Sequence, residues 1–374
     1  MEVLALLVII LIVANLQIML FCDWVFNKLD YTCQFSVSEA HEGDEIFLVE
    51  TVHNRKILPV PWLKVNINTS KWLDFAETLS VVAQESRCVT SNFLLKSYQK
   101  TIRRWKVKCS KRGVFTTENV TFIGGDLFNL SNVSFPVRVD AKVVVYPEVL
   151  NLEEMFVPAN YLQGDNIVRR WIVDDPFIVA GAREYTSGDS MNRIHWRATA
   201  KEGRLMVRKN DFTSRLSLTV ILNIQSIEFE YKDVVDKEMM ELGIKAAATF
   251  LDKALKTGSP VRLASNSCTV DKKDEMIFTD EASGRNHIGE LLKILAQLQL
   301  MNLMDFDNFL PEIAEGIQGS DIIIITCYIN EQICSTARAL KLKGNSVKLL
   351  ILDPLVNVSD LPGDLDCYIL AGGD

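Results

Sequence analysis

The sequence predicts one N-terminal transmembrane helix, then an antiparallel β-sandwich domain, then a doubly wound α/β domain. Three observations support this fold class. No charged residue occurs between Val3 and Cys22. Short runs of alternating apolar and polar residues fill the part from 32 to 148, and longer apolar runs alternate with helical patterns in the part from 216 to 374. A chain of 374 residues has room for two globular units and an anchor.

The first segment, residues 1–27, is interpreted as a membrane anchor. Its uncharged stretch would form a helix about 30 Å long, which matches the hydrocarbon core of a bilayer. A cleavable signal peptide is the alternative, but Glu2 precedes the apolar run and no basic leading segment is present. Lys28 follows the run. The positive-inside rule therefore predicts a single-pass protein of the cell membrane with its globular part in the cytoplasm.

The segment 32–148 has the residue pattern of half-buried strands. Leu63, Val65 and Ile67 alternate with polar residues, and the region has turn residues at regular spacing, with room for about seven strands. The part from 216 onward has apolar runs at 216–224, 322–325 and 347–352, separated by helical patterns. Such alternation indicates a parallel sheet covered by helices on both faces, with a ligand site beyond the carboxyl ends of its strands.

Composition excludes several classes of function. The net charge of −8, with no zinc-finger spacing, argues against nucleic-acid binding. The eight cysteines contain no C-x-x-C pair, which argues against a zinc site and is typical of a reducing compartment. The four histidines are dispersed, and G-x-S-x-G, P-loop and H-E-x-x-H motifs are absent from the sequence. We therefore expect no enzyme, no catalytic residue and no cofactor.

The connector, residues 149–215, contains an unusual segment at 181–208, which reads GAREYTSGDSMNRIHWRATAKEGRLMVR. This segment resembles the signature of the domain-of-unknown-function-58 family, R-E-Y-x-x-G-D-x-x-x-x-I-x-W-x-x-x-A followed by L-M-V. The resemblance implies a leading membrane segment, a β domain that ends at Val145-Tyr146-Pro147, and a von Willebrand factor A-like C-terminal domain. It also implies association with bacterial MoxR-type AAA+ ATPases, whose partners in this family have no established activity of their own.

The chain departs from the common family pattern in three places. Many members have two leading spans where this chain has one. Many also have Asp at the position of His195 and Arg at the position of Lys201, so any role that rests on those two side chains does not carry over.

The signature supplies the candidate binding residues. Arginine side chains pair with carboxylates or phosphates and stack on aromatic rings, which suits either of two interpretations. The segment is a charged docking surface, or it is an ordered connector with Trp196 in a core and arginine–carboxylate pairs as internal ties. The candidates are Arg183, Glu184, Tyr185, Gly188, Asp189, Arg193, His195, Trp196, Arg197 and Arg204. His195 beside Asp189 is the one acid–base pairing in this set, and we interpret it as non-catalytic.

The resemblance to von Willebrand factor A domains also bears on metal binding. Members that bind a divalent ion use D-x-S-x-S after their first strand, because a hard cation needs carboxylate and hydroxyl oxygens. Here Asn223, Gln225 and Ile227 stand at those positions, and Cys327 stands where such members have Asp. We therefore expect a degenerate site without specific divalent-ion binding, in which Asn223 and Gln225 bond to nearby backbone.

The function expected from the sequence is a membrane-tethered binding or scaffold protein that is a partner of a MoxR-type AAA+ ATPase. Other membrane proteins and the lipid bilayer, through the N-terminal helix, are its further expected partners. Two alternatives stay open: an envelope-facing adhesion or ligand-binding module, and a hydrolase of unknown type.

Overall fold

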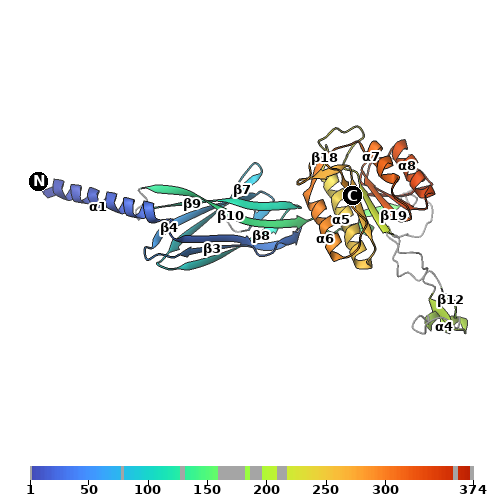
Figure 1. Ribbon diagram of the computed structural model, residues 1–374, viewed down its shortest axis with the longest axis horizontal. Helices are drawn as coiled ribbons and strands as arrows, with labels where there is room; N and C mark the ends of the chain where they lie inside the picture. The colour runs from blue at the N-terminus through green and yellow to red at the C-terminus, as the bar shows by residue number, and fades with distance from the viewer. Residues whose placement is uncertain are drawn as a thin grey trace. The chain divides into compact units, whose positions relative to one another are not determined.

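The computed structural model describes residues 2–76, 80–126, 131–158, 182–185, 196–208, 217–356 and 361–370. The chain divides into two compact units, Met1–Glu148 and Val149–Asp374 (Figure 1). The first unit consists of one helix and β-strands, and the second combines helices with a mixed β-sheet.

The β unit consists of two sheets that enclose one apolar core. The smaller sheet has the order β1 (Leu29–Phe35), β3 (Glu45–Asn54), β8 (Lys100–Cys109) and β5 (Leu73–Phe75). The larger has the order β2 (Glu39–His41), β10 (Asn132–Tyr146), β9 (Gly113–Gly125), β4 (Val60–Ser70), β7 (Ser86–Leu95) and β6 (Ser80–Ala83). Its strands are antiparallel except for β2, which pairs in parallel with β10. Two facing sheets around one core make a β-sandwich.

Glu50 on β3 is a charged side chain that is fully buried in this unit. Its Oε2 accepts hydrogen bonds from Ser91 Oγ at 2.7 Å and from Trp105 Nε1 at 3.1 Å, and its Oε1 accepts one from the Tyr31 hydroxyl at 3.1 Å. Burial raises the pKa of Glu50 above its ordinary value of 4.5, although these hydrogen bonds act in the opposite direction.

The raised pKa of Glu50 predicts that the stability of the β unit depends on pH. The folded carboxyl holds its proton more tightly than the unfolded one, so its contribution to the stability of the β unit is present below pH 4.5. That contribution is lost as the pH rises through the raised pKa. We expect the free energy of unfolding, measured in urea from pH 4 to pH 8, to decline less with pH in Glu50→Gln than in the wild type. Equal slopes would contradict the assignment of the raised pKa to Glu50.

Helix α1 (Glu2–Trp24) is joined to the β unit through Lys56. The Lys56 ammonium donates hydrogen bonds to the carbonyl oxygens of Trp24 and Val25, both at 2.5 Å, and to that of Asn27 at 3.1 Å. A cation at this position satisfies the unpaired carbonyls that a helix leaves at its C-terminus. Val25 is buried in the β core, and the Phe26 ring lies 6.0 Å from that of Phe122.

The predicted transmembrane helix is wrong. Within the described part of the chain, none of the helices combines the length and the apolar character that crossing a bilayer requires. The predicted cell-membrane location and orientation stay predictions that no observation tests.

The α/β unit is built on a seven-stranded sheet. Its strand order is β11 (Phe156–Pro158), β21 (Asp366–Leu370), β20 (Ser346–Ile351), β19 (Ser320–Thr326), β14 (Ser217–Leu222), β15 (Val261–Ser265) and β17 (Ile277–Phe278). The five central strands are parallel. Because these strands are buried on both faces, they consist of nearly continuous aliphatic residues, such as Ile322 to Ile325 on β19.

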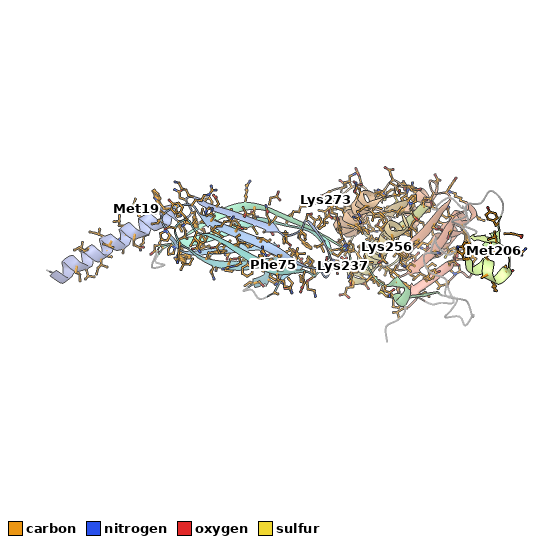
Figure 2. The ribbon with its side chains drawn as sticks, turned by 90° about the horizontal axis from the view of Figure 1, so that it is seen from below. Met19, Phe75, Met206, Lys237, Lys256 and Lys273 are labelled. Carbon is orange, nitrogen blue, oxygen red and sulfur yellow. The ribbon has the colours of Figure 1, made fainter. Side chains whose placement is uncertain are left out.

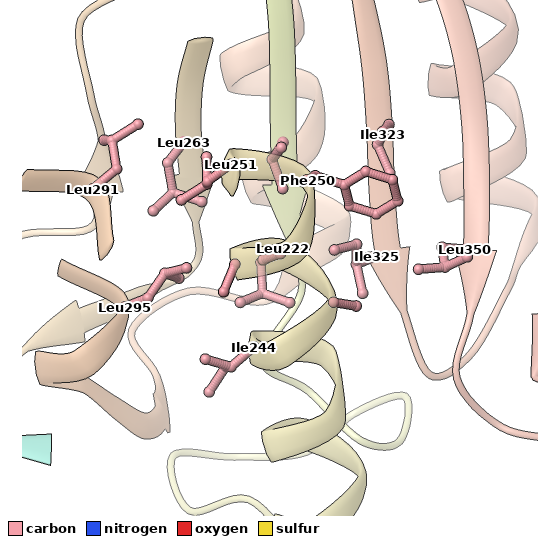
Figure 3. Close-up of a cluster of buried hydrophobic side chains, with 14 of the residues drawn as sticks. Leu222, Ile244, Phe250, Leu251, Leu263, Leu291, Leu295, Ile323, Ile325 and Leu350 are labelled. Atoms are coloured by element: carbon pink, nitrogen blue, oxygen red, sulfur yellow. The ribbon is translucent and has the colours of Figure 1, made fainter. Parts of the chain in front are cut away.

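Helices cover both faces of this sheet. Helices α5 (Lys237–Thr257) and α6 (Arg285–Gln297) pack on one face. Helices α7 (Phe306–Ala314) and α8 (Glu331–Leu342) pack on the other. Figure 3 shows Phe250 of α5 directed at β19 and the strands beside it. Gly243 permits this close approach, because a Cβ there would lie 2.8 Å from Leu352 Cδ1. The unit also contains α2 (Leu152–Met155) and a two-stranded sheet formed by β16 (Ser267–Thr269) and β18 (Leu298–Asn302).

The von Willebrand factor A-like part of the predicted fold class is also wrong, because the unit is not a clear example of that fold. The sheet was expected to be parallel, but both of its edge strands are antiparallel to their neighbours: β11 to β21, and β17 to β15. The apolar periodicity that α6 follows continues to Leu300, but the helix ends at Gln297 and the chain continues as strand β18. Its edge pairing with β16 takes the last apolar residues of the pattern out of the helix.

Candidate functional site

The carboxyl edge of the sheet is the first candidate site. Strand β14 has β15 on one side and β19 on the other, so the chain leaves β14 at a topological switch point, where α/β sheets bind ligands. Asn223 follows β14, and its amide nitrogen donates to Thr326 Oγ1 at the end of β19, 3.1 Å away. Asn223 Oδ1 accepts from the backbone N–H of Gln225 at 2.9 Å. The network thus joins the two strands across the switch point.

Asn266, which follows β15, is the centre of this network. It is fully buried, and its Oδ1 accepts from the backbone N–H of Ile224 at 2.9 Å. Its amide nitrogen donates to Met304 O at 3.1 Å, with longer contacts to Asn223 Oδ1 at 3.3 Å and Gln225 Oε1 at 3.4 Å. Gln225 Oε1 also accepts from the N–H of Phe306 at 2.6 Å. These amides therefore fill the crevice with hydrogen bonds to one another.

The loop after β14 is closed by a second buried group, Glu230. Its carboxylate accepts from Ser226 N at 2.7 Å and from Ser226 Oγ at 2.8 Å, and it also accepts from the N–H of Val235. Asp236 N in turn donates to Ser226 Oγ at 3.1 Å. Ser226 is therefore committed to Glu230 and to the start of α5, not to a ligand.

Outside this network, three polar side chains meet at the start of α8. The Asn330 amide nitrogen donates to Glu228 Oε1 at 2.8 Å and to Asp307 Oδ2 at 2.9 Å. Burial raises the pKa of Asp307 above its ordinary range. Among the residues that the structure describes, no group of three or more His, Cys, Asp or Glu side chains is arranged to hold a metal ion. The lack of divalent-ion binding expected at Asn223, Gln225 and Ile227 stays a prediction.

The signature segment supplies the second candidate site. It contains β12 (Ala182–Glu184), helix α4 (Trp196–Glu202) and β13 (Met206–Arg208), with β12 antiparallel to β13. We call the described residues 182–185 and 196–208 the signature element. The side chain of Met206, labelled in Figure 2, is buried, and the Met206 N–H donates to Thr199 Oγ1 at 3.0 Å.

The exposed side of the signature element carries an aromatic ring and an ion pair. Trp196, the first residue of α4, is 68% exposed. Arg204 Nη1 lies 3.4 Å from Glu184 Oε2, and both of these side chains are exposed. The interpretation of Trp196 as part of a core is therefore wrong. The arginine–carboxylate tie is present in this pair, at the surface of the element.

The other predicted signature residues are only partly described. Tyr185 is half-buried, and its backbone N–H donates to Leu205 O at 2.9 Å. The side chains of Arg183 and Arg197 lie outside the described part of the chain, as do Gly188, Asp189, Arg193 and His195 altogether. The proposed pairing of His195 with Asp189 thus lies outside the described residues.

Sequence reasoning missed Asn266 and Glu230, which hold the carboxyl edge together. Asn266 directly follows an apolar strand that lies next to β14, so a polar residue at a strand end was the available signal. Glu230 has no such signal, because its carboxylate acts on the loop that contains it and accepts hydrogen bonds from residues within five positions.

The described residues form a β-sandwich unit and an α/β unit. Side-chain hydrogen bonds close the carboxyl edge of the sheet, and the signature element carries the exposed Trp196. Residues 181–361 match the family model described as "Protein of unknown function DUF58". That part of the chain is therefore similar to the family that the signature segment resembles.

Comparisons with other proteins add little. No curated protein matches the chain. Among solved structures, a non-cellulosomal cohesin from the archaeon Archaeoglobus fulgidus is 13% identical, with a TM-score of 0.22, and the match covers 33% of this chain and 94% of that one. The CARDB domain of the PF1109 protein from Pyrococcus furiosus is 13% identical, with a TM-score of 0.19, and the match covers 30% and 90%. Scores this low carry no argument about fold or function.

Proposed function

We propose that this protein is a binding or scaffold protein that acts with a MoxR-type AAA+ ATPase, and that the signature element docks on that partner. The observation that carries the proposal is the exposure of Trp196 at the start of α4. The ATPase is proposed from the family resemblance, and the docking role is proposed from the exposed side chains.

Exposed tryptophan and arginine are the side chains that most often dominate protein interfaces. Removing the apolar area of an indole ring from water is favourable. A partner that covers Trp196 would therefore bind more tightly by that contribution. Lys201 and Arg204 are exposed in the same element. Together with Arg197 and Arg208, they give residues 196–208 four basic side chains against one acidic side chain, Glu202. This composition favours an acidic patch on the partner.

The proposal predicts that Trp196→Ala weakens binding of the full chain to a MoxR-type ATPase by about 30-fold or more, because a central aromatic anchor contributes about 2 kcal/mol. Arg204→Glu is expected to slow association and to reduce its salt dependence. Biolayer interferometry with the immobilised ATPase at two salt concentrations measures both effects.

The matched controls are Tyr231→Ala, an aromatic ring 80% exposed in the same unit, and Lys232→Glu. Neither residue belongs to the signature element, so both variants should bind like the wild type. Correctly folded Trp196→Ala and Arg204→Glu proteins that bind the ATPase with wild-type rates would exclude the signature element as the docking site.

A further inference from the structure

The α/β unit has a cleft of about 460 Å³ that belongs to neither site above. It lies between the edge strand β17 and helix α7 and is lined mainly by the apolar side chains of Met276, Phe278, Phe309 and Ile313. The carboxylates of Glu275 and Glu312 also line it.

Strand alternation explains why the floor of the cleft is apolar. Ile277 of β17 is buried with the cluster under α5 and α6, whereas Met276 packs on the cluster under α7 and α8. Side chains two positions apart share a face of a strand, so Phe278 points to the same side as Met276. Phe309 and Ile313 of α7 are buried at the base. Phe278 itself is 50% exposed, which leaves apolar area for a ligand to cover.

Of the charged side chains at the cleft, the one without an ion-pair partner in the described part of the chain is negative. Glu275 forms an ion pair with Lys272 at 2.7 Å, and Arg262, which stacks on the Phe278 ring at 5.0 Å, lies 4.0 Å from Glu281. Within the described part of the chain, no ion pair to Glu312 is present. Glu312 is exposed on α7, so a cation in the cleft would meet an available carboxylate.

The position of β17 adds backbone groups to this surface. In the described sheet, β17 is the last strand and pairs on one side only, with Ala264 opposite Phe278 and Ser265 opposite Ile277. An edge strand presents backbone N–H and C=O groups on its open side, and an extended peptide can pair with them. The edge has two residues, which is short enough to limit non-specific pairing.

We infer that this cleft binds an extended segment of a partner protein in which apolar side chains alternate with lysine or arginine. Such a segment pairs with the edge of β17, places an apolar side chain over Phe278 and Ile313, and directs a basic side chain to Glu312. The inference does not depend on the docking role of Trp196.

The test uses the full chain and a fluorescein-labelled hexapeptide, Lys-Leu-Lys-Val-Lys-Leu, in fluorescence anisotropy titrations. We expect binding of this basic peptide in the range of about 1 µM to 1 mM, typical of a weak peptide site. Glu312→Lys should weaken it by about tenfold, because the variant replaces attraction by repulsion. Phe278→Ala should weaken it by about fivefold through the loss of apolar area.

Glu315→Lys is the matched control, because Glu315 is an exposed carboxylate at the end of the same helix that does not line the cleft. This variant and Trp196→Ala should bind the peptide like the wild type. Equal affinity for Glu-Leu-Glu-Val-Glu-Leu, or unchanged affinity in Glu312→Lys, would overturn the inference. Self-association in sedimentation runs without peptide, abolished by Glu312→Lys, would also overturn it by making a second copy the occupant.

Discussion

Replacing Phe250 with alanine is expected to lower the free energy of unfolding of the α/β unit by about 3–5 kcal/mol, the usual range for a buried phenylalanine. Phe250 is among the largest fully buried side chains. It lies in the cluster that joins α5 to the sheet, together with Leu222 and Ile323 (Figure 3). The sheet strands cannot move to fill the space, because their backbone pairing fixes their spacing, so a cavity would remain.

Urea denaturation of the full chain, followed by circular dichroism, measures this cost. Phe229→Ala is the control, since Phe229 is 85% exposed in the same unit, and its removal should change stability by about 0.5 kcal/mol or less. A loss of less than about 1 kcal/mol in Phe250→Ala would mean that α5 does not pack on the sheet as described.

Asn266→Asp is the second substitution with a large expected effect. The Asn266 amide nitrogen donates to three oxygens, those of Met304, Asn223 and Gln225. A carboxylate there would place an unpaired negative charge against three acceptors in a buried site, at a cost of about 3–5 kcal/mol.

The stability of the Asn266→Asp variant should also depend on pH. Burial among acceptors would raise the pKa of the introduced carboxyl, so its stability should improve as the pH falls and the group is protonated. Asn308→Asp, an exposed position on α7, supplies the same chemical change without burial and should leave stability nearly unchanged. Equal unfolding midpoints for the two variants at pH 7 would show that the amide network does not hold the carboxyl edge together.

The sequence was most informative where one periodicity continued over many residues. The alternation at Leu63, Val65 and Ile67 predicted a half-buried strand, and these three residues are buried on β4. The aliphatic run from Ile322 to Ile325 predicted a strand buried on both faces, and it forms most of β19. In both cases the burial of one or two faces determines the pattern directly.

The edges of the α/β sheet were not predictable in this way. Strand β17 has two residues and β11 has three. Their directions follow from pairing with β15 and with β21, and β21 is distant in sequence from β11. Periodicity records burial but not strand direction, so a parallel sheet was assumed throughout.

The sequence predicted the location of the candidate site better than it predicted the contacts between its side chains. Asn223 and Gln225 were expected at the end of the first strand with bonds to nearby backbone, and both accept backbone N–H groups there. Their side-chain partners Thr326 and Asn266 come from neighbouring strands, and only the strand order brings them together. The connector interpretation placed Trp196 in a core because tryptophan is usually buried, and local sequence does not reveal that α4 leaves it exposed.

We propose that the signature element contacts a MoxR-type ATPase, and site-specific photo-crosslinking tests this contact most directly. A benzophenone amino acid is placed at position 196 of the full chain, and a matched variant carries it at the exposed position 231. We predict an ATPase crosslink from position 196 that excess unlabelled chain abolishes, and none from position 231. The absence of a crosslink from 196, or equal crosslinks from both positions, would contradict the claim.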